Sequence, residues 1–319
     1  MRFRALAAPA ALFAVFAAAA PLRAQNDRVY IYRYTVDADV PESAGMIAMD
    51  ATPLRVLRAS APKPLMASVF GSLTDRRSGG GAAVDLSPYW LAGGGRRSLE
   101  GYRRMTLAGR LTRVLTKTVL SVAALQEGGD AGELRLGIGV RSTFHDPHDP
   151  IGPAFGLPER VELARRTGGP GAVDSVYAAV RREVRAQCCL QVTGGWGLEL
   201  RAPQGEPGKL GNARHTVWLA GQFTLSERWD LLTTVRGRGL FDSGANLRTG
   251  AGLQYKTSAA DLFAEVAFDT NDHRLHPGGG AEVRLARHVS AVAAVAREMD
   301  AGDSRARLRA VLRWYPTNP

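Results

Sequence analysis

Residues 190–201 read LQVTGGWGLELR and alternate between apolar and polar side chains almost without error. The even positions hold leucine, valine, glycine and tryptophan, whereas the odd positions include Gln191, Thr193, Glu199 and Arg201. Because neighbouring side chains of a β-strand point to opposite faces, this stretch predicts a strand with one apolar and one polar face. It is longer than the strands of most soluble sheets and matches a tilted strand that crosses a membrane.

The same alternation recurs along most of the chain and predicts an all-β protein with about twelve strands. The expected strands are 82–91, 103–113, 115–125, 132–142, 190–201, 212–225, 228–241, 246–256, 259–269, 277–286, 288–299 and 303–315. The second and third of these are poorly patterned. The strand number is even, and the connections alternate between long and short. Both features are typical of an antiparallel up-and-down transmembrane β-barrel of the outer-membrane type.

The N-terminus is typical of an exported protein. Arg2 and Arg4 precede an uncharged apolar run, and the small residue Ala24 precedes a plausible cleavage point. We therefore expect residues 1–24 to be a secretory signal peptide, because the run of about 16 apolar residues is shorter than a spanning helix needs. Later apolar runs are shorter still, so a membrane role would have to use strands.

The rest of the chain divides into a lead-in and a barrel. Residues 25–80 are rich in proline, and we expect a periplasmic lead-in with a possible helix at 63–73 that plugs the lumen. Residues 81–319 form the expected barrel, which is interrupted by an insert at 143–189. Two parts of this insert, 157–166 and 173–187, have apolar residues at helical spacing. Strand parity places the insert on the side of the short turns, hence in the periplasm.

Charge and cysteine content exclude several classes of function. The net charge is +11, and it falls to +8 once Arg2, Arg4 and Arg23 leave with the signal peptide. The basic residues are spaced along strands in an exported chain, so we expect no nucleic-acid partner. Cys188 and Cys189 are adjacent, which predicts neither a disulfide framework nor a metal site, and we expect no cofactor.

Alternation alone leaves two interpretations open. In a soluble barrel the apolar face is the core, whereas in a membrane barrel it contacts lipid and the charged face lines the lumen. Export, strand length and loop asymmetry favour the second. An arginine or lysine that faces lipid costs about 2–4 kcal/mol, so these side chains should point inward together with the acidic ones of the same face. The expected lumen-facing residues are Arg135, Arg236, Arg238, Arg248, Lys256, Arg284, Arg307, Arg309, Glu133, Glu199, Asp261, Glu265 and Glu282.

Two motifs resemble chemical sites, but neither is complete. Residues 145–150 read HDPHDP and could bind a divalent metal, although two prolines and a connecting position favour an ordinary turn. His288-Val289-Ser290 is similar to the His-x-Ser of outer-membrane phospholipases, but Ala291-Val292 follows where those enzymes have Asn-Gly. We therefore expect no metal site and no enzyme activity.

Three stretches near the N-terminus carry a resemblance to a protein family. They are residues 40–44 (VPESA), 61–65 (APKPL) and 82–91, which end in SPYWL. They resemble the opening of a group of uncharacterised bacterial exported proteins, in which a proline-rich lead-in precedes a first strand ending in Pro-Tyr-Trp-Leu. The resemblance covers about 50 residues and implies an outer-membrane-type protein. The C-terminus departs from the usual barrel ending, since Pro316 follows Trp314-Tyr315.

The combined expectation is an outer-membrane β-barrel of a double-membraned bacterium, acting as a narrow pore or as a structural envelope protein. Its charged interior favours a mild anion preference, and the alternative is a ladder of salt bridges that fills a closed lumen. A second functional class is a closed barrel that recruits an envelope protein through its helical insert or outer loops. Outer-membrane lipid is the expected partner in either case.

Overall fold

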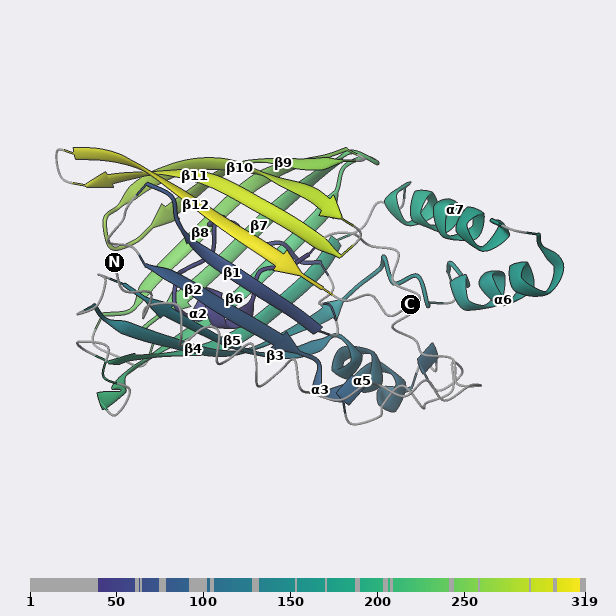
Figure 1. Ribbon diagram of the computed structural model, residues 1–319, viewed down its shortest axis with the longest axis horizontal. Coiled ribbons are helices and arrows are strands. Elements are labelled where there is room, and N and C mark those ends of the chain that lie inside the picture. Colours follow the sequence, from purple (N-terminus) through teal and green to yellow (C-terminus); the bar gives the residue numbers. More distant parts are fainter. Residues whose placement is uncertain are drawn as a thin grey trace, which may run out of the picture.

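The alternating segments form twelve strands, each paired with its sequence neighbour, that close into an antiparallel barrel in the computed structural model (Figure 1). The ring closes where β1 (Leu65–Ser72) pairs with β12 (Asp303–Trp314). The other strands are β2 (Gly80–Leu86), β3 (Thr118–Gln126), β4 (Leu134–His145), β5 (Leu190–Ala202), β6 (Gly211–Thr224), β7 (Trp229–Arg238), β8 (Asn246–Lys256), β9 (Ala260–Asp269), β10 (Arg274–Ala286) and β11 (Val289–Asp300). The predicted fold class is therefore confirmed.

The structure describes residues 40–315 except 61–62, 64, 75–78, 92–101, 104–105, 128–131, 153, 170, 187–189, 203–205, 207–208, 241–243, 258, 287 and 301–302. The predicted signal peptide lies outside these residues, as do Cys188 and Cys189. No helix among the described residues is long and apolar enough to cross a membrane.

The prediction of a strand at 103–113 was wrong, because α5 (Leu107–Thr116) occupies this region. Its leucines recur at every fourth residue, which is the spacing of one helix face. Thr106 caps the helix, since its hydroxyl accepts a hydrogen bond from the Gly109 amide at 3.3 Å. A capped helix with a leucine stripe thus replaces the poorly patterned strand.

The prediction of a plug helix at 63–73 was also wrong, because residues 65–72 form β1, which pairs with β2 and β12. Because residues such as Ala67 and Ser68 are small, the alternation of apolar and polar side chains along β1 is weak in the sequence. The expected first strand, 82–91, is the second strand of the barrel and ends at Leu86. Pro88–Leu91 form a short helix, α3, because proline suits the first turn of a helix. One missed strand and one wrong strand leave the total at twelve.

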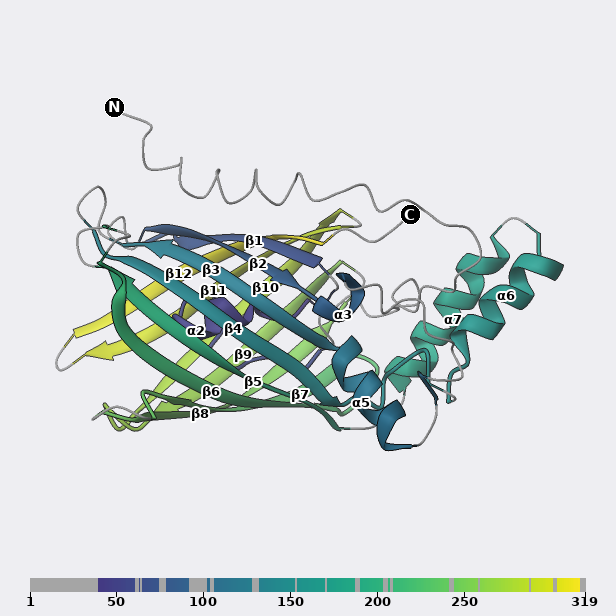
Figure 2. The ribbon, with the colours of Figure 1, turned by 90° about the horizontal axis from the view of Figure 1, so that it is seen from below.

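The two ends of the barrel differ, as Figures 1 and 2 show. At one end, here called the helical end, lie α3, α5 and a hairpin of α6 (Leu157–Thr167) and α7 (Ala172–Ala186). The short turns 225–228 and 257–259 lie at the same end, where β1 begins and β12 finishes. The opposite end is called the loop end. The helical insert is confirmed, and it lies on the side of these short turns.

The α6–α7 hairpin has a small core of its own. Leu157 and Val161 of α6 pack with Val180 and Val184 of α7, and Tyr102 joins the same cluster from the connection before β3. This core is separate from the apolar clusters inside the barrel. The hairpin is therefore held together independently and projects beyond the barrel wall (Figure 2).

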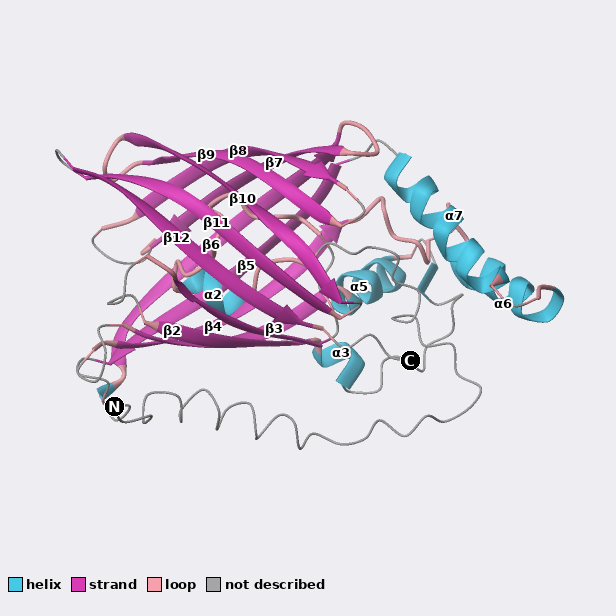
Figure 3. Cartoon of the chain, turned by 45° about the horizontal axis from the view of Figure 1, so that its top comes forward, coloured by secondary structure: helices cyan, strands magenta, loops and turns pink. Residues whose placement is uncertain are grey.

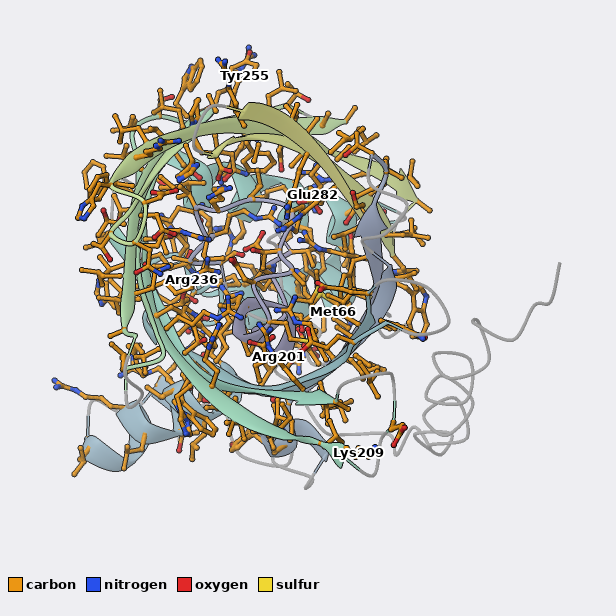
Figure 4. The ribbon with its side chains drawn as sticks, turned by 90° about the vertical axis from the view of Figure 1, so that its left-hand side faces the viewer. Met66, Arg201, Lys209, Arg236, Tyr255 and Glu282 are labelled. Carbon is orange, nitrogen blue, oxygen red and sulfur yellow. The ribbon has the colours of Figure 1, made fainter. Side chains whose placement is uncertain are left out.

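The two faces of the barrel wall have opposite character. Large apolar side chains are exposed on its outside along eleven of the twelve strands, among them Val69, Leu120, Ile138, Trp196, Leu219, Trp229, Leu253, Leu262, Val283, Val295 and Leu312. The charged side chains alternate with them and point inward, as Arg201, Arg236 and Glu282 do in Figure 4. An apolar exterior around a polar interior is the polarity of a barrel that sits in lipid.

Candidate functional site

The lumen is occupied by the chain itself. Residues 40–60, here called the plug, run inside the barrel, and all of them except Asp50, Ala51 and Arg55 are buried. The plug includes a short helix, α2 (Ala44–Ala48), which Figure 3 shows inside the ring of strands. Its first limb leads from the helical end towards Asp50, and its second limb returns to β1. Residues 40–60 of the predicted lead-in are therefore an internal element.

Glycines on the inner face of the wall make room for α2. A Cβ atom added to Gly139 of β4 would lie 2.8 Å from the Cβ of Ala44, and one added to Gly197 of β5 would lie 2.7 Å from the Cβ of Ala48. Both distances are too short for real carbon atoms. Only glycine at these positions lets the plug backbone approach the wall so closely.

Apolar side chains of the plug fill the spaces between the inward-pointing polar ones. Met46 and Met49 pack with Phe70 and other residues of the wall, and Leu54 packs with Phe263 on the opposite side. These clusters are the apolar core of the barrel interior. The plug thus contributes to stability in the way that a core element does.

At the helical end the plug is fastened by buried ion pairs. The guanidinium of Arg58 donates to the carboxylate of Glu42 from Nε at 3.1 Å and from Nη2 at 3.0 Å, and it also contacts Glu282 of β10. Arg313 of β12 lies 3.5 Å from both carboxylates. Ser290 of β11 donates to Glu282 at 2.6 Å. Such pairs tolerate burial only because each charge is matched.

Arg141 of β4 holds the two limbs of the plug by their main chain. Its guanidinium donates to the carbonyl oxygen of Glu42 at 3.2 Å, of Arg58 at 2.7 Å and of Ser60 at 2.8 Å. The side chain is 1% exposed. One wall residue therefore recognises backbone positions at both ends of the plug.

Towards the loop end, the carboxylate of Asp50 lies among arginines of the wall. Arg236 Nη2 is 2.5 Å from Oδ1, Arg248 Nη1 is 3.0 Å from the same atom, and Arg238 Nη1 is 3.9 Å from Oδ2. Arg309 donates to the carbonyl oxygens of Asp50 and Thr52, at 3.1 and 2.9 Å. We call Arg236, Arg238, Arg248 and Arg309 the arginine cluster.

The local backbone and electrostatics of Asp50 fit this position. Its φ of 57° lies in the left-handed region, which aspartate adopts more readily than most residues when the chain turns. The guanidinium groups of Arg236 and Arg248 compensate the negative charge of its carboxylate. The plug turn therefore carries a stable negative charge.

A second carboxylate, Glu199 of β5, organises neighbouring arginines. Arg135 Nε lies 2.5 Å from it and Arg201 Nε 3.2 Å, while Arg238 donates to its other oxygen. Arg135 also donates to the carbonyl oxygen of Met49. This group links the arginine cluster to the main chain of the plug.

The returning limb is bound through its amides. The carboxylate of Glu265 accepts hydrogen bonds from the amides of Arg55, at 2.9 and 3.0 Å, and Val56, at 2.8 Å. The hydroxyl of Thr234 accepts from the Leu57 amide at 2.7 Å. Wall side chains thus replace the strand partner that this extended segment lacks.

Most residues that the sequence predicts on the lumen face lie around the plug. Those that contact the plug directly are Arg135, Arg236, Arg238, Arg248, Arg309, Glu265 and Glu282, and Glu199 pairs with two of them. Others pair within the wall: Lys256 with Asp230, Arg284 with Asp261, and Glu133 with Arg201. Arg307 is exposed near the loop end of β12.

Charged residues of the site that the sequence prediction lacks are Glu42, Asp50, Arg58, Arg141 and Arg313. Glu42, Asp50 and Arg58 lie in the proline-rich lead-in, where no strand or helix pattern marks them. Arg313 lies four residues after Arg309, and Arg141 lies six residues after Arg135, and an even interval places each on the same strand face as a predicted residue. Those even intervals were the signal that could have identified both.

The HDPHDP stretch forms part of a buried latch. Lys117 Nζ lies 2.7 Å from Asp146 and 2.9 Å from Asp149, and the hydroxyl of Tyr102 donates to Asp149 at 2.6 Å. Gln191 of β5 donates to Asp146 at 3.0 Å. The lysine ammonium thus takes the place between the carboxylates that a cation would need. No group of three or more His, Cys, Asp or Glu able to hold a metal occurs among the described residues.

Comparisons with known proteins extend no further than the barrel. No protein-family model matches the chain, and no curated protein matches it. The solved structures that resemble it include the KdgM porin, at 7% identity and a TM-score of 0.44 over 78% of this chain and 98% of that one. An outer membrane channel from Pseudomonas putida F1 has 10% identity and a TM-score of 0.43 over 83% and 97%. The Acinetobacter baumannii outer membrane protein Omp33 has 8% identity and a TM-score of 0.40 over 79% and 98%. Likeness at this level carries no argument about function.

Proposed function

We propose that this protein is an outer-membrane β-barrel that its own plug closes at rest and that becomes a narrow pore when the plug leaves the lumen. The observation that carries the proposal is the burial of residues 40–60 inside the closed ring of strands. A segment that fills the lumen from the helical end to the arginine cluster blocks it for ions as well as for larger solutes.

The exterior supports a position in lipid. Trp229 and Tyr255 pack with tilted rings at the helical end, their centroids 4.7 Å apart, and Trp314 is 44% exposed at the same end. Aromatic side chains at this level are typical of the border between lipid and water. Because bacterial barrels keep their short turns in the periplasm, the helical end and its insert would face that compartment.

The wall around the plug supports a preference for anions once the lumen is free. The plug carries two acidic and two basic residues and is itself neutral, so its departure leaves the charge of the wall alone. The charged wall residues that contact it are Arg135, Arg141, Arg236, Arg238, Arg248, Arg309 and Arg313, against Asp85, Glu265 and Glu282. An excess of basic side chains in a narrow lumen selects anions.

The test compares the full chain with a variant that lacks residues 44–57. This deletion removes the part of the plug that crosses the lumen but keeps Glu42 and Arg58, which already lie side by side. Each protein is first checked by gel mobility with and without heating, since a folded barrel shifts on boiling. In planar bilayers we expect few openings of the full chain and steady, anion-selective steps of the variant. Equal steady conductance of both proteins would contradict the closed resting state.

A second candidate is a closed barrel that presents the α6–α7 hairpin to another envelope protein. It is favoured by the separate core of the hairpin and by the Lys117 latch that fixes it to the rim. Removal of residues 154–186 distinguishes a docking element from a part of the fold. A barrel that still shifts on boiling after this deletion supports a hairpin free for a partner, and an unfolded one contradicts it.

A further inference from the structure

We propose that the arginine cluster is a binding site for a small anion with several carboxylates, and that the Asp50 side chain occupies this site from within the chain. The inference deepens the proposed function and rests on it, because it names the class of solute that would take the place of the plug. It is carried by the geometry around Asp50 and by guanidinium groups whose hydrogen-bonding capacity Asp50 does not fill.

The cluster is built from three strands that converge on one carboxylate. Arg236 and Arg238 come from β7, Arg248 from β8 and Arg309 from β12 (Figure 4 labels Arg236 inside the ring). Planar guanidinium groups recognise carboxylates through paired N–H donors, which makes arginine the usual residue at such sites. Asp50 occupies the cluster as a bound carboxylate would, with its Oδ1 2.5 and 3.0 Å from two of the guanidinium groups.

A single carboxylate leaves donors of the cluster unused. Arg236 Nη1 and Arg238 Nε are buried and have no hydrogen-bond partner among the described residues. Buried donors without a partner carry a free-energy cost of about 1–3 kcal/mol each. An anion with more oxygens than Asp50 could satisfy them in addition to the contacts that Asp50 makes.

The charge of the cluster also favours an anion with more than one carboxylate. Arg248 has Asp269 as a second partner and Arg238 has Glu199, but Arg236 pairs with Asp50 alone in the part of the chain that the structure describes. Arg309 contacts only carbonyl oxygens of the plug there. Without Asp50, two guanidinium groups would therefore be left without a carboxylate.

The site is partly exposed to solvent. The side chain of Asp50 is 25% exposed and that of Arg238 is 18% exposed, whereas Glu42 at the helical end is fully buried. A tethered carboxylate acts at an effective concentration in the millimolar range or above. A monoanion therefore competes poorly with the Asp50 carboxylate. A polycarboxylate competes better, because it can bind several arginines at once.

The first test uses citrate as the probe on the folded full chain and on Asp50→Asn, which removes the competing negative charge without changing the size of the side chain. Titration calorimetry should show citrate binding to Asp50→Asn on the order of tenfold tighter than to the parent chain, because the internal competitor is gone. The matched control is Asp261→Asn, which removes a wall carboxylate beside Arg284 near the helical end, away from the arginine cluster. It should bind citrate as the parent chain does.

The triple variant Asp50→Asn/Arg236→Gln/Arg309→Gln should lose the increase in citrate affinity that Asp50→Asn produces. If it binds citrate as tightly as Asp50→Asn, or if Asp50→Asn binds no tighter than the parent chain, the assignment is overturned. Calorimetry does not depend on conduction, so citrate binding together with a folded but silent 44–57 deletion variant would refute the pore and leave the site standing. Steady conduction of the deletion variant without tighter citrate binding to Asp50→Asn would support the pore and refute the site.

A second measurement covers the case in which Asp50→Asn does not fold. Ala51→Cys, in a chain with Cys188→Ser and Cys189→Ser, reports the exposure of the plug turn through its rate of thiol labelling. Citrate should raise this rate several-fold over sodium chloride of the same ionic strength, because the displaced turn is more exposed. Equal rates in both salts would overturn the proposal.

Discussion

Glu42 and Arg58 face each other across the two limbs of the plug, with Arg58 Nη2 3.0 Å from Glu42 Oε1 and both side chains fully buried. The pair closes residues 42–58 into a loop, and the contact of Arg58 with Glu282 fastens that loop to β10. Because the pair lies between plug and wall, a change at either residue tests whether the plug belongs to the stable core of the barrel.

Replacement of this arginine should therefore destabilise the whole barrel. Arg58→Ala leaves Glu42 and Glu282 short of a cation in a buried site, and we expect a loss of about 3–5 kcal/mol in the free energy of unfolding. Urea titration of the protein folded into lipid vesicles measures it. Arg166→Ala is the control, since its pair with Glu162 is exposed on α6 and should contribute about 0.5 kcal/mol or less. Equal effects of the two changes would contradict a structural role of the plug.

A larger residue in place of a wall glycine that contacts α2 should displace the plug from the wall. In Gly197→Val the new Cβ would meet Ala48, so α2 must move away from the wall at a cost of about 1–3 kcal/mol. We expect more frequent openings in planar bilayers than the parent chain shows. Gly169→Ala is the control, because no atom lies within 4 Å of a Cβ added there. A Gly197→Val protein that folds and stays as silent as the control would contradict the prediction.

The latch of the helical insert should resist mild acid. Burial alone would raise the pKa of Asp149, but the Lys117 ammonium and the Tyr102 hydroxyl outweigh it and hold the pKa below its ordinary value of about 3.9. A lowered carboxyl pKa gives stability that is complete above the ordinary value and is lost as the pH falls through the lowered one. Near-ultraviolet circular dichroism should thus stay constant from about pH 7 to 5 and change only below about pH 4. A change already between pH 7 and 5 would contradict this assignment.

The same latch can be weakened by mutation at neutral pH. Asp149→Asn keeps the shape of the side chain but removes the charge that Lys117 faces, so the hairpin should detach more often. Tryptic cleavage within α6 and α7 should become several-fold faster than in the parent chain. Glu162→Gln, on the exposed face of α6, should leave the rate unchanged.

The leucine stripe of α5 should contact lipid. Leu107, Leu111 and Leu115 are 74%, 54% and 52% exposed on a helix at the rim, while Thr112 and Thr116 on its other side are buried. Exposed leucines close to an apolar barrel exterior fit a helix that lies in the membrane interface. A polarity-sensitive dye on Leu111→Cys, in a chain with Cys188→Ser and Cys189→Ser, should shift its emission to the blue in vesicles. The same dye on Leu163→Cys of α6 should report water, and equal spectra at both positions would contradict the placement.

The sequence predicts the barrel well because its strands follow a local rule. Alternation along 190–201 is visible without any knowledge of what the strand packs against, and β5 has nearly these bounds. In β1 the same rule fails, since Ala67, Ser68 and Gly71 differ too little in polarity to mark a face. The sequence does not predict the plug for another reason. Residues such as Asp50 and Arg58 pair with wall residues that are far away in the sequence, so no local pattern marks them as site residues.

The order of the elements along the chain has a consequence for the plug. The plug directly precedes β1, the strand that closes the ring against β12. In the filled barrel it supplies carbonyl groups and the Glu42 carboxylate to Arg141 and Arg313, partners that only water could replace in an empty lumen. Because the plug is covalently joined to a strand of the wall, a plug that leaves the lumen remains tethered at the mouth of its own barrel.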